Sequence, residues 1–271
     1  MSRPKDLPEF DSPPVVETVL SVQFENLTKM HAAHFGLFWN EIRGRFPNTE
    51  ERATLEPVVE VFPSTPDRRF GIKLESSDRP PMPRVWFSSE DGNSLIQVQS
   101  DRLIRNWRKV GDGDAYPRYE SVRKSFEDDL AHFAKFTASN DLGEITVNQC
   151  EVTYVNHIIA GPGWSQLSEI EKVFNFAGFP TLEFLGRPED VALRARFQVL
   201  DGSGQPVGRL HVEVQPAARI QDGTNMYVFN LTARGLTDER LGFLDLGRDA
   251  IVRSFASLTT AAMHKIWGRR D

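Results

Sequence analysis

The sequence predicts an α+β fold made of two similar halves, each an antiparallel sheet with helices packed on one face. Two observations lead to this prediction. First, residues 14–24 and 148–159 alternate apolar and polar side chains, as half-buried strands do. Second, each of these segments is followed by a helix-like segment, then by hairpin-forming strands, and then by a long amphipathic helix. We therefore expect one supersecondary unit to be used twice.

The expected organisation is an extended N-terminal arm at residues 1–13, a first half at 14–145 and a second half at 146–271, packed as one compact unit. Prolines in the arm favour an extended chain. Glu17 occupies the position in the first strand that Glu151 occupies in its counterpart. The halves are accordingly expected to superpose with these two glutamates close together.

In the first half, apolar side chains at helical spacing predict a helix that Thr28 caps and Pro47 ends. Strands are expected at residues 58–62 and 70–74. Asp91-Gly92 is a strong hairpin signal, and the register it sets pairs Val85 with Val98 and Phe87 with Ile96. The side chains of the helical stripe are Phe35, Phe38, Trp39, Ile42 and Phe46.

A further strand at residues 103–107 precedes a long helix at 119–137. One stripe of this helix is apolar, and the opposite face is charged and expected to be solvated. The apolar stripe is Val122, Phe126, Leu130, Phe133 and Phe136. The charged face carries Arg123, Lys124, Glu127, Asp128 and Lys135.

The second half repeats this order, with a short helix capped by Ser165, strands near residues 193–199, 210–214 and 226–233, and a last helix at 248–267. If Gly202-Ser203 is a two-residue turn, Arg196 lies opposite Arg209 and Arg194 lies opposite His211. Like charges that face each other across strands are unfavourable unless a negative group is near. Either a neighbouring carboxylate such as Glu213 balances them, or this face binds an anionic ligand or an acidic partner.

Composition limits the classes of function. The 271 residues include 32 basic and 38 acidic side chains, for a net charge of −6, which disfavours nucleic acid as a partner. A single cysteine, Cys150, excludes an internal disulfide and a multi-cysteine metal site. No apolar run approaches the length of a membrane span, and residues 1–11 lack the apolar segment of a signal peptide. We expect a cytoplasmic protein without a membrane partner.

Several motifs together resemble a sporadically distributed bacterial family of uncharacterised proteins of about 250 residues. They are Pro13-Pro-Val-Val-Glu-Thr-Val-Leu20, Leu95-Ile-Gln-Val-Gln-Ser-Asp-Arg-Leu103, Asn106-Trp-Arg108, Tyr116-Pro-Arg-Tyr119 and the segment 227–235 with the helix ending near Trp267. The resemblance implies no activity and no catalytic residues, and its patchy distribution suits a defence or toxin-control locus. The topology of each half is similar to the TATA-binding-protein and helix-grip class, which implies nothing about chemistry.

Motifs of catalysis and metal binding are weak. His31 and His34 could share a helix face, but no third ligand stands at a diagnostic spacing, so we interpret them as a surface pair. Cys150 lies on the apolar side of its predicted strand and His157 on the other, so they form no simple dyad. Phosphate-binding loops are absent and no carboxylate pair forms a motif, although glycosidase-type chemistry stays open. No cofactor is expected.

Two candidate binding surfaces remain. Arg105 and Trp107 share one face of a strand, where an arginine beside an indole can hold an anion or a peptide edge; the alternative is a packed tryptophan with arginines in salt bridges. The second surface is the basic sheet face already described, formed by Arg194, Arg196, Arg209 and His211.

The leading hypothesis is a non-enzymatic binding protein with an unknown protein partner or anionic ligand, and homodimerisation stays open. The alternative is a small-molecule binder or enzyme that uses a cavity between the sheet and a long helix.

Overall fold

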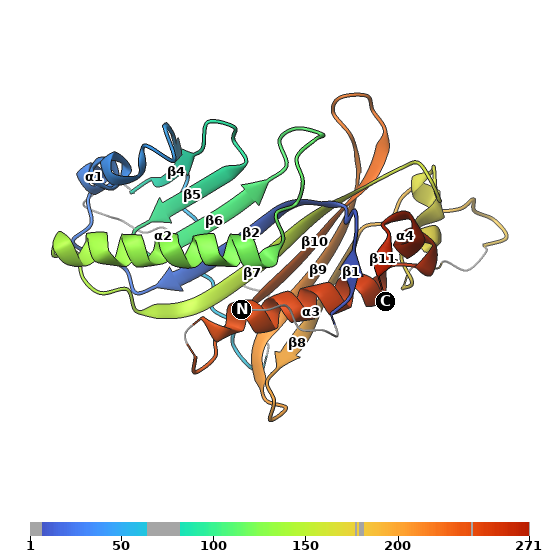
Figure 1. The fold of residues 1–271 in the computed structure, drawn as a ribbon. Helices are drawn as coiled ribbons and strands as arrows, with labels where there is room; N and C mark the ends of the chain where they lie inside the picture. The colour runs from blue at the N-terminus through green and yellow to red at the C-terminus, as the bar shows by residue number, and fades with distance from the viewer. Residues whose placement is uncertain (1–6, 64–81, 177, 179–181, 240, 271) are drawn as a thin grey trace. The chain divides into compact units, whose positions relative to one another are not determined.

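The computed structural model describes residues 7–63, 82–176, 178, 182–239 and 241–270. The α+β class is confirmed: helices pack on antiparallel sheet (Figure 1). The chain forms two compact units. Unit 1 comprises residues 1–18, 115–120 and 151–271, and unit 2 comprises residues 19–114 and 121–150. The internal duplication and the superposition of Glu17 on Glu151 remain predictions.

Unit 2 is a sheet covered by two helices. In sheet order its strands are β3 (Asn48–Arg52), β4 (Arg84–Ser88), β5 (Ser94–Gln99), β6 (Arg102–Arg108) and the part of β2 (Val15–Phe24) that begins at Val19. The predicted hairpin register is confirmed, with Val85 opposite Val98 and Phe87 opposite Ile96. Ring contacts join helices α1 (Ala32–Ile42) and α2 (Tyr119–Ser139) to the sheet. The rings at their centre are Phe24, Phe38, Phe87, Phe133 and Phe136.

Unit 1 is built around four strands. In sheet order they are β7 (Val147–Ile159, here from Glu151), β10 (Asn225–Gly235), β9 (Pro206–Ala218) and β8 (Leu193–Leu200). Helix α3 (Gly242–Leu258) packs on β10 and β9, and α4 (Ala261–Ile266) follows it (Figure 1). Two short strands, β1 (Glu9–Phe10) and β11 (Arg269–Arg270), pair with each other. The N-terminal arm therefore contains a short strand, whose Phe10 is buried.

The first helix differs from its prediction at both ends. It begins at Ala32 and ends at Ile42, so Thr28 is not its cap and Pro47 does not end it. The N-terminal cap is His31, whose backbone N–H donates to Nδ1 of His34 at 2.9 Å. This contact explains the histidine pair that was predicted to lie on the surface, where His31 is exposed and His34 is half-buried.

The strand predicted at residues 58–62 was wrong. These residues form no strand, and the observed strand is β3, ten residues earlier. The other predicted strand, at residues 70–74, lies outside the described residues.

The continuous last helix was also wrong. It is interrupted at Thr259, whose backbone is extended and whose hydroxyl donates to the Phe255 carbonyl at 2.7 Å. Thr260 then caps α4 by accepting the Met263 N–H, so two threonine side chains compete with the helical bonding pattern.

The register of the β8–β9 hairpin is shifted by two residues from the prediction. The Asp201 N–H donates to the Gln205 carbonyl, which closes a three-residue loop instead of a two-residue turn and shifts the pairing by one. A bulge between Val199 and Leu200 shifts it by another. The predicted pairings are therefore wrong: Arg196 lies opposite His211, and Arg194 opposite Glu213.

Helix details also differ at two positions. The short helix that follows β7 is the 3-10 helix η1 (Leu167–Lys172), and its N-terminal cap is Gln166 and not Ser165. Arg123 on α2 is buried rather than solvated, and it forms an ion pair with Glu127 at 2.7 Å.

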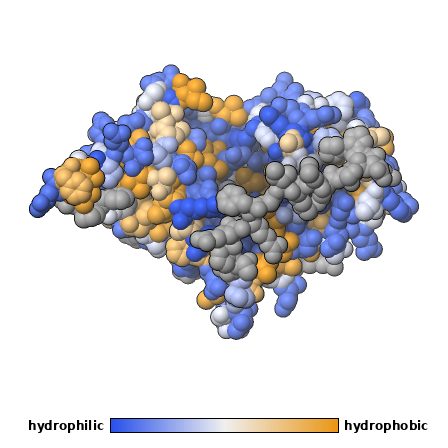
Figure 2. Space-filling model, turned by 180° about the vertical axis from the view of Figure 1, so that it is seen from behind, coloured by the Kyte–Doolittle hydropathy of each residue, from blue (hydrophilic) through white to orange (hydrophobic). Residues whose placement is uncertain are grey.

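Exposed hydrophobic side chains lie scattered among hydrophilic ones on the surface seen in Figure 2.

Candidate functional site

Arg105, one of the predicted binding residues, is paired with a carboxylate inside unit 2. It is buried, and its guanidinium donates to the Asp129 carboxylate and lies 5.3 Å from the centre of the Phe46 ring. Burial lowers the pKa of Arg105, and Asp129 acts in the opposite direction. Trp107, on the same strand, is also buried. The contacts of Arg105 correspond to those of a structural ion pair.

The second predicted surface is divided by the corrected register. Arg194 forms an ion pair with Glu213 at 3.2 Å, the neighbouring carboxylate that the sequence analysis considered. Arg196 is exposed opposite His211, and Arg209 is buried opposite Gln198. Only Arg196 and His211 are brought face to face, so the proposed facing pair of arginines on β8 and β9 does not form.

Cys150 is buried in unit 2, and burial raises the pKa of its thiol to about 12. A thiol with so high a pKa carries almost no thiolate at neutral pH, which agrees with its interpretation as a core residue. Within the described part of the chain, no group of three or more His, Cys, Asp or Glu side chains could hold a metal ion.

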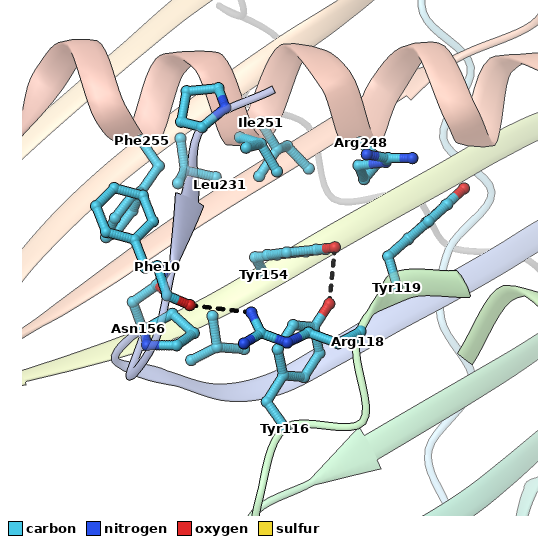
Figure 3. A pocket seen from close by; sticks show the side chains of 14 residues that line it. Phe10, Tyr116, Arg118, Tyr119, Tyr154, Asn156, Leu231, Arg248, Ile251 and Phe255 are labelled. Carbon is cyan, nitrogen blue, oxygen red and sulfur yellow. Dashed lines mark hydrogen bonds between the residues drawn. The ribbon is translucent and has the colours of Figure 1, made fainter. Parts of the chain in front are cut away.

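A cavity in unit 1 was not selected from the sequence. We call it the tyrosine pocket. It holds a space of about 60 Å³ in which a water-sized molecule can be centred. The side chains of the pocket come from β1, β2, the 116–119 segment, β7, β10 and α3 (Figure 3). They are Pro8, Phe10, Pro13, Val15, Tyr116, Arg118, Tyr119, Tyr154, Asn156, Leu231, Arg248, Ile251, Val252 and Phe255.

The pocket has an apolar end and a polar end. Figure 3 shows Phe10, Leu231 and Phe255 together on one side. The hydroxyl groups of Tyr116 and Tyr154 lie on the other side, with the guanidinium of Arg248. Strand alternation accounts for the placement of Tyr154, which follows Val152 on the inner face of β7. A helical spacing brings Arg248, Ile251 and Phe255 to the same face of α3.

Two tyrosines form the floor of the polar end. The Tyr116 hydroxyl donates to the Tyr154 hydroxyl at 2.9 Å. Burial raises the pKa of both hydroxyls, and that of Tyr154 lies well above its ordinary value. Both therefore stay protonated at neutral pH. Because Tyr116 is the donor of this pair, the Tyr154 hydroxyl can donate its own proton to a bound molecule.

Arg248 is the cation of the polar end. It is 5% exposed, and its guanidinium lies 4.6 Å from the centre of the Tyr119 ring. Its ion pairs are loose: 3.6 Å to Glu120 and 3.2 Å to Asp249. Neither contact has the geometry of a hydrogen bond, and Nε of Arg248 is buried without a partner among the described residues. The charge of Arg248 is therefore balanced by two carboxylates, but its Nε donor is not satisfied.

Arg118 shapes the segment that carries Tyr116 and Tyr119. Its backbone φ is 68°, in the left-handed region that residues other than glycine rarely adopt. Its Nη1 donates to the Phe10 carbonyl at 3.1 Å, which ties this segment to β1. The Tyr119 hydroxyl in turn donates to Asp245 of α3 at 2.9 Å. An unusual backbone conformation at a pocket is consistent with a functional constraint.

Tyr116-Pro-Arg-Tyr119 is one of the motifs described from the sequence, but its residues have no predicted role. Tyr154 and Arg248 were not predicted as site residues, because both lie on elements whose apolar pattern indicates core. Their partners are distant in the sequence, so spacing alone carries no signal of the pocket.

Among the described residues, no helix is both long and apolar enough to cross a membrane. In comparisons with known proteins, no protein-family model matches the chain, and no curated protein shows significant similarity to it.

Proposed function

We propose that the protein binds a small molecule in the tyrosine pocket, and that this molecule has an apolar body and an oxygen acceptor at one end. A short-chain carboxylic acid or its amide has this chemistry. The observation that carries the proposal is Arg248, a buried arginine whose Nε has no hydrogen-bond acceptor among the described residues. A buried donor without an acceptor costs free energy, which a ligand oxygen would recover.

The shape of the pocket supports an amphipathic ligand. A carboxylate or amide oxygen at the polar end can accept from Arg248 and from the Tyr154 hydroxyl together. The apolar body would contact Phe10, Leu231 and Phe255 at the other end. Because one water occupies roughly 10–15 Å³ of such space, the cavity of about 60 Å³ has room for about five heavy atoms.

Binding is favoured over catalysis by the residues that line the pocket. Among the described residues in the lining there is no carboxylate, histidine, serine, cysteine or lysine. The tyrosines are held protonated by burial, so neither is a general base at neutral pH. We therefore propose a non-enzymatic binding protein, as in the leading hypothesis from the sequence, that uses a cavity for a small molecule, as in the alternative.

The test compares butyrate, butyramide and butylammonium by ligand-observed saturation-transfer NMR on the full chain. The first two carry an oxygen acceptor, whereas butylammonium has the same chain length but only donors. We expect butyrate and butyramide to bind and butylammonium not to bind. Arg248→Met should weaken binding of both by at least tenfold, because it removes the guanidinium donors.

Two controls make the result specific. Arg253→Met removes an exposed arginine of the same helix and should leave binding unchanged. Tyr154→Phe removes one donor without changing any charge, so it should weaken binding several-fold even if Arg248→Met lowers stability by leaving Glu120 uncompensated. Absence of any butyrate or butyramide signal with wild type, or unchanged binding in both pocket variants, would contradict the proposal.

A further inference from the structure

In unit 2, one segment of the chain crosses the polar face of the sheet. Residues 55–60 have no regular secondary structure, and we call them the crossing segment. Phe24 packs against Phe133 of α2, so its neighbour Gln23 projects to the opposite face of the sheet. Gln99 and Gln149 alternate in the same way with the buried Val98 and Cys150. These three glutamines, one from each of β5, β2 and β7, are named the glutamine ladder.

The glutamine ladder holds the crossing segment by its backbone. Gln99 accepts the Leu55 N–H and donates to the Leu55 carbonyl, both at 2.9 Å. Gln23 accepts the Val58 N–H at 3.0 Å, and Gln149 accepts the Glu60 N–H at 3.1 Å. Between them, Arg102 donates to the Glu56 carbonyl at 3.0 Å. Every one of these contacts would form with any non-proline residue at the same position of the segment.

The spacing of the contacts shows an extended chain that runs across the strands. The contacts proceed from β5 through β6 and β2 to β7, which are successive strands. Three steps between strands cover about 14 Å. Five residues from Leu55 to Glu60 reach about 17 Å when fully extended. The crossing segment is therefore nearly straight, as a bound peptide would be.

Side chains of the crossing segment contribute little to this contact. Val58 and Val59 are 41% and 56% exposed, and Val61 just beyond is 65% exposed. Burial of apolar surface therefore contributes little to holding the segment, in which Leu55 is half-buried and both valines are exposed. The fit is also incomplete: Nε2 of Gln149, a side chain that is 4% exposed, has no hydrogen-bond partner among the described residues. Another backbone carbonyl at this rung would satisfy it.

We infer that the glutamine ladder is a binding site for an extended polypeptide, recognised through its backbone and largely independent of its side chains. The crossing segment occupies this site from within the same chain. A partner's peptide would take the place of the crossing segment and would complete the unsatisfied rung at Gln149. This inference concerns unit 2 and is independent of the tyrosine pocket.

The experiment uses the full chain with Leu55→Pro, Val58→Pro and Glu60→Pro, which removes the three N–H donors of the crossing segment because proline has none. A fluorescent peptide of residues 53–62 is titrated by anisotropy. We expect the triple-proline variant to bind this peptide at least tenfold more tightly than wild type does. The same peptide N-methylated at those three amides should not bind, and one with all its valines changed to threonine should bind within twofold.

Ladder substitutions locate the site. Added to the triple-proline variant, Gln99→Met or Gln149→Met should weaken peptide binding at least fivefold. Gln198→Met changes an exposed glutamine of unit 1 and should have no effect. A folded triple-proline variant that binds no better than wild type, or equal binding of the N-methylated peptide, would overturn the inference.

If the triple-proline variant does not melt cooperatively, the inference is tested instead by amide hydrogen exchange of the wild-type protein with and without peptide. Excess peptide should accelerate exchange at the amides of Leu55, Val58 and Glu60 as the crossing segment is displaced. Unchanged exchange at these amides would overturn the inference as well.

Discussion

Two buried arginines show how the surroundings of a residue separate structure from function. Arg105 donates to the Asp129 carboxylate and lies over Phe46, so its donors have acceptors inside unit 2. Arg248 is equally buried, but its two ion pairs lack hydrogen-bond geometry. The sequence favoured Arg105 because Trp107 stands beside it, whereas Arg248 has no such neighbour. Local sequence cannot report whether a buried donor finds an acceptor, because the acceptor comes from another element.

Cys150 provides a test at the same scale. Its thiol is fully buried, and burial raises its pKa to about 12 from an ordinary value near 9. The thiolate fraction at pH 8 should therefore be about 1,000-fold lower in the folded protein than in the unfolded chain. We expect an aromatic disulfide reagent to label the native protein at least that much more slowly than the protein in denaturant.

The pH dependence has a definite sign. Since the folded pKa of Cys150 lies above the unfolded one, ionisation of the thiol favours the unfolded state, and stability should fall as the pH rises above about 9. Changing Cys150 to Ala should remove that contribution. Labelling of the native protein at the unfolded rate would indicate an accessible thiol and reopen the question of a nucleophile.

At the scale of elements, the residues of each hairpin loop determined whether the strand register could be predicted. Asp91-Gly92 offers one turn position, and the register it predicts is the observed one. The Asp201-Gly-Ser-Gly204 loop contains two glycines, so a two-residue turn and a three-residue loop are both compatible with the sequence. The left-handed residue is Gly204, with φ of 81°, and the bulge beyond it had no marker in the sequence. Most of the apolar side chains predicted for the stripes of α1 and α2 are buried, but Arg123 of the predicted solvated face is buried as well. The helix ends depended on local contacts of His31 and Thr259 that the sequence did not indicate.

The contact between α3 and its sheet gives an element-scale prediction. A Cβ on Gly235 would lie 2.3 Å from the Val207 carbonyl oxygen and 2.4 Å from the Phe243 ring. Gly235→Ala should therefore destabilise the protein by about 1–3 kcal/mol, since both neighbours are buried or part of the backbone. Gly202→Ala is the matched control, because no atom lies within 4 Å of the added group. Chemical denaturation of both variants measures the difference, and equal stabilities would contradict this packing.

At the scale of the whole molecule, the chain passes repeatedly between its two units. Strand β2 leaves unit 1 at Thr18, and β7 enters it at Glu151. The alternation of both strands was predictable, but the assignment of one strand to two units was not, because it depends on contacts that are distant in the sequence. The tyrosine pocket has the same origin, since its lining joins residues near positions 10, 118, 154 and 250.

This connectivity predicts that the first half of the sequence does not fold alone. A fragment of residues 1–145 lacks the Glu151–Asp271 part of unit 1 and also residues 146–150 of unit 2. It retains Phe10 without Phe255 and Trp267, so large apolar surface would be exposed at roughly 1.5–3 kcal/mol for each side chain. We expect this fragment to aggregate or to melt without a cooperative transition in calorimetry. A soluble monomer with a sharp transition would show that the first half is autonomous.

The pairing of Glu9–Phe10 with Arg269–Arg270 places the first and the last described strands beside each other in unit 1. A linker from Arg270 to Leu7 would therefore connect neighbouring strands, and the chain would be opened instead at the exposed Gly202–Ser203 loop. In such a circular permutant the strand pair becomes an internal hairpin, and Phe10 is covalently tied to the element that follows α4. The order in which the segments are synthesised would change, while the wall of the tyrosine pocket would keep every side chain.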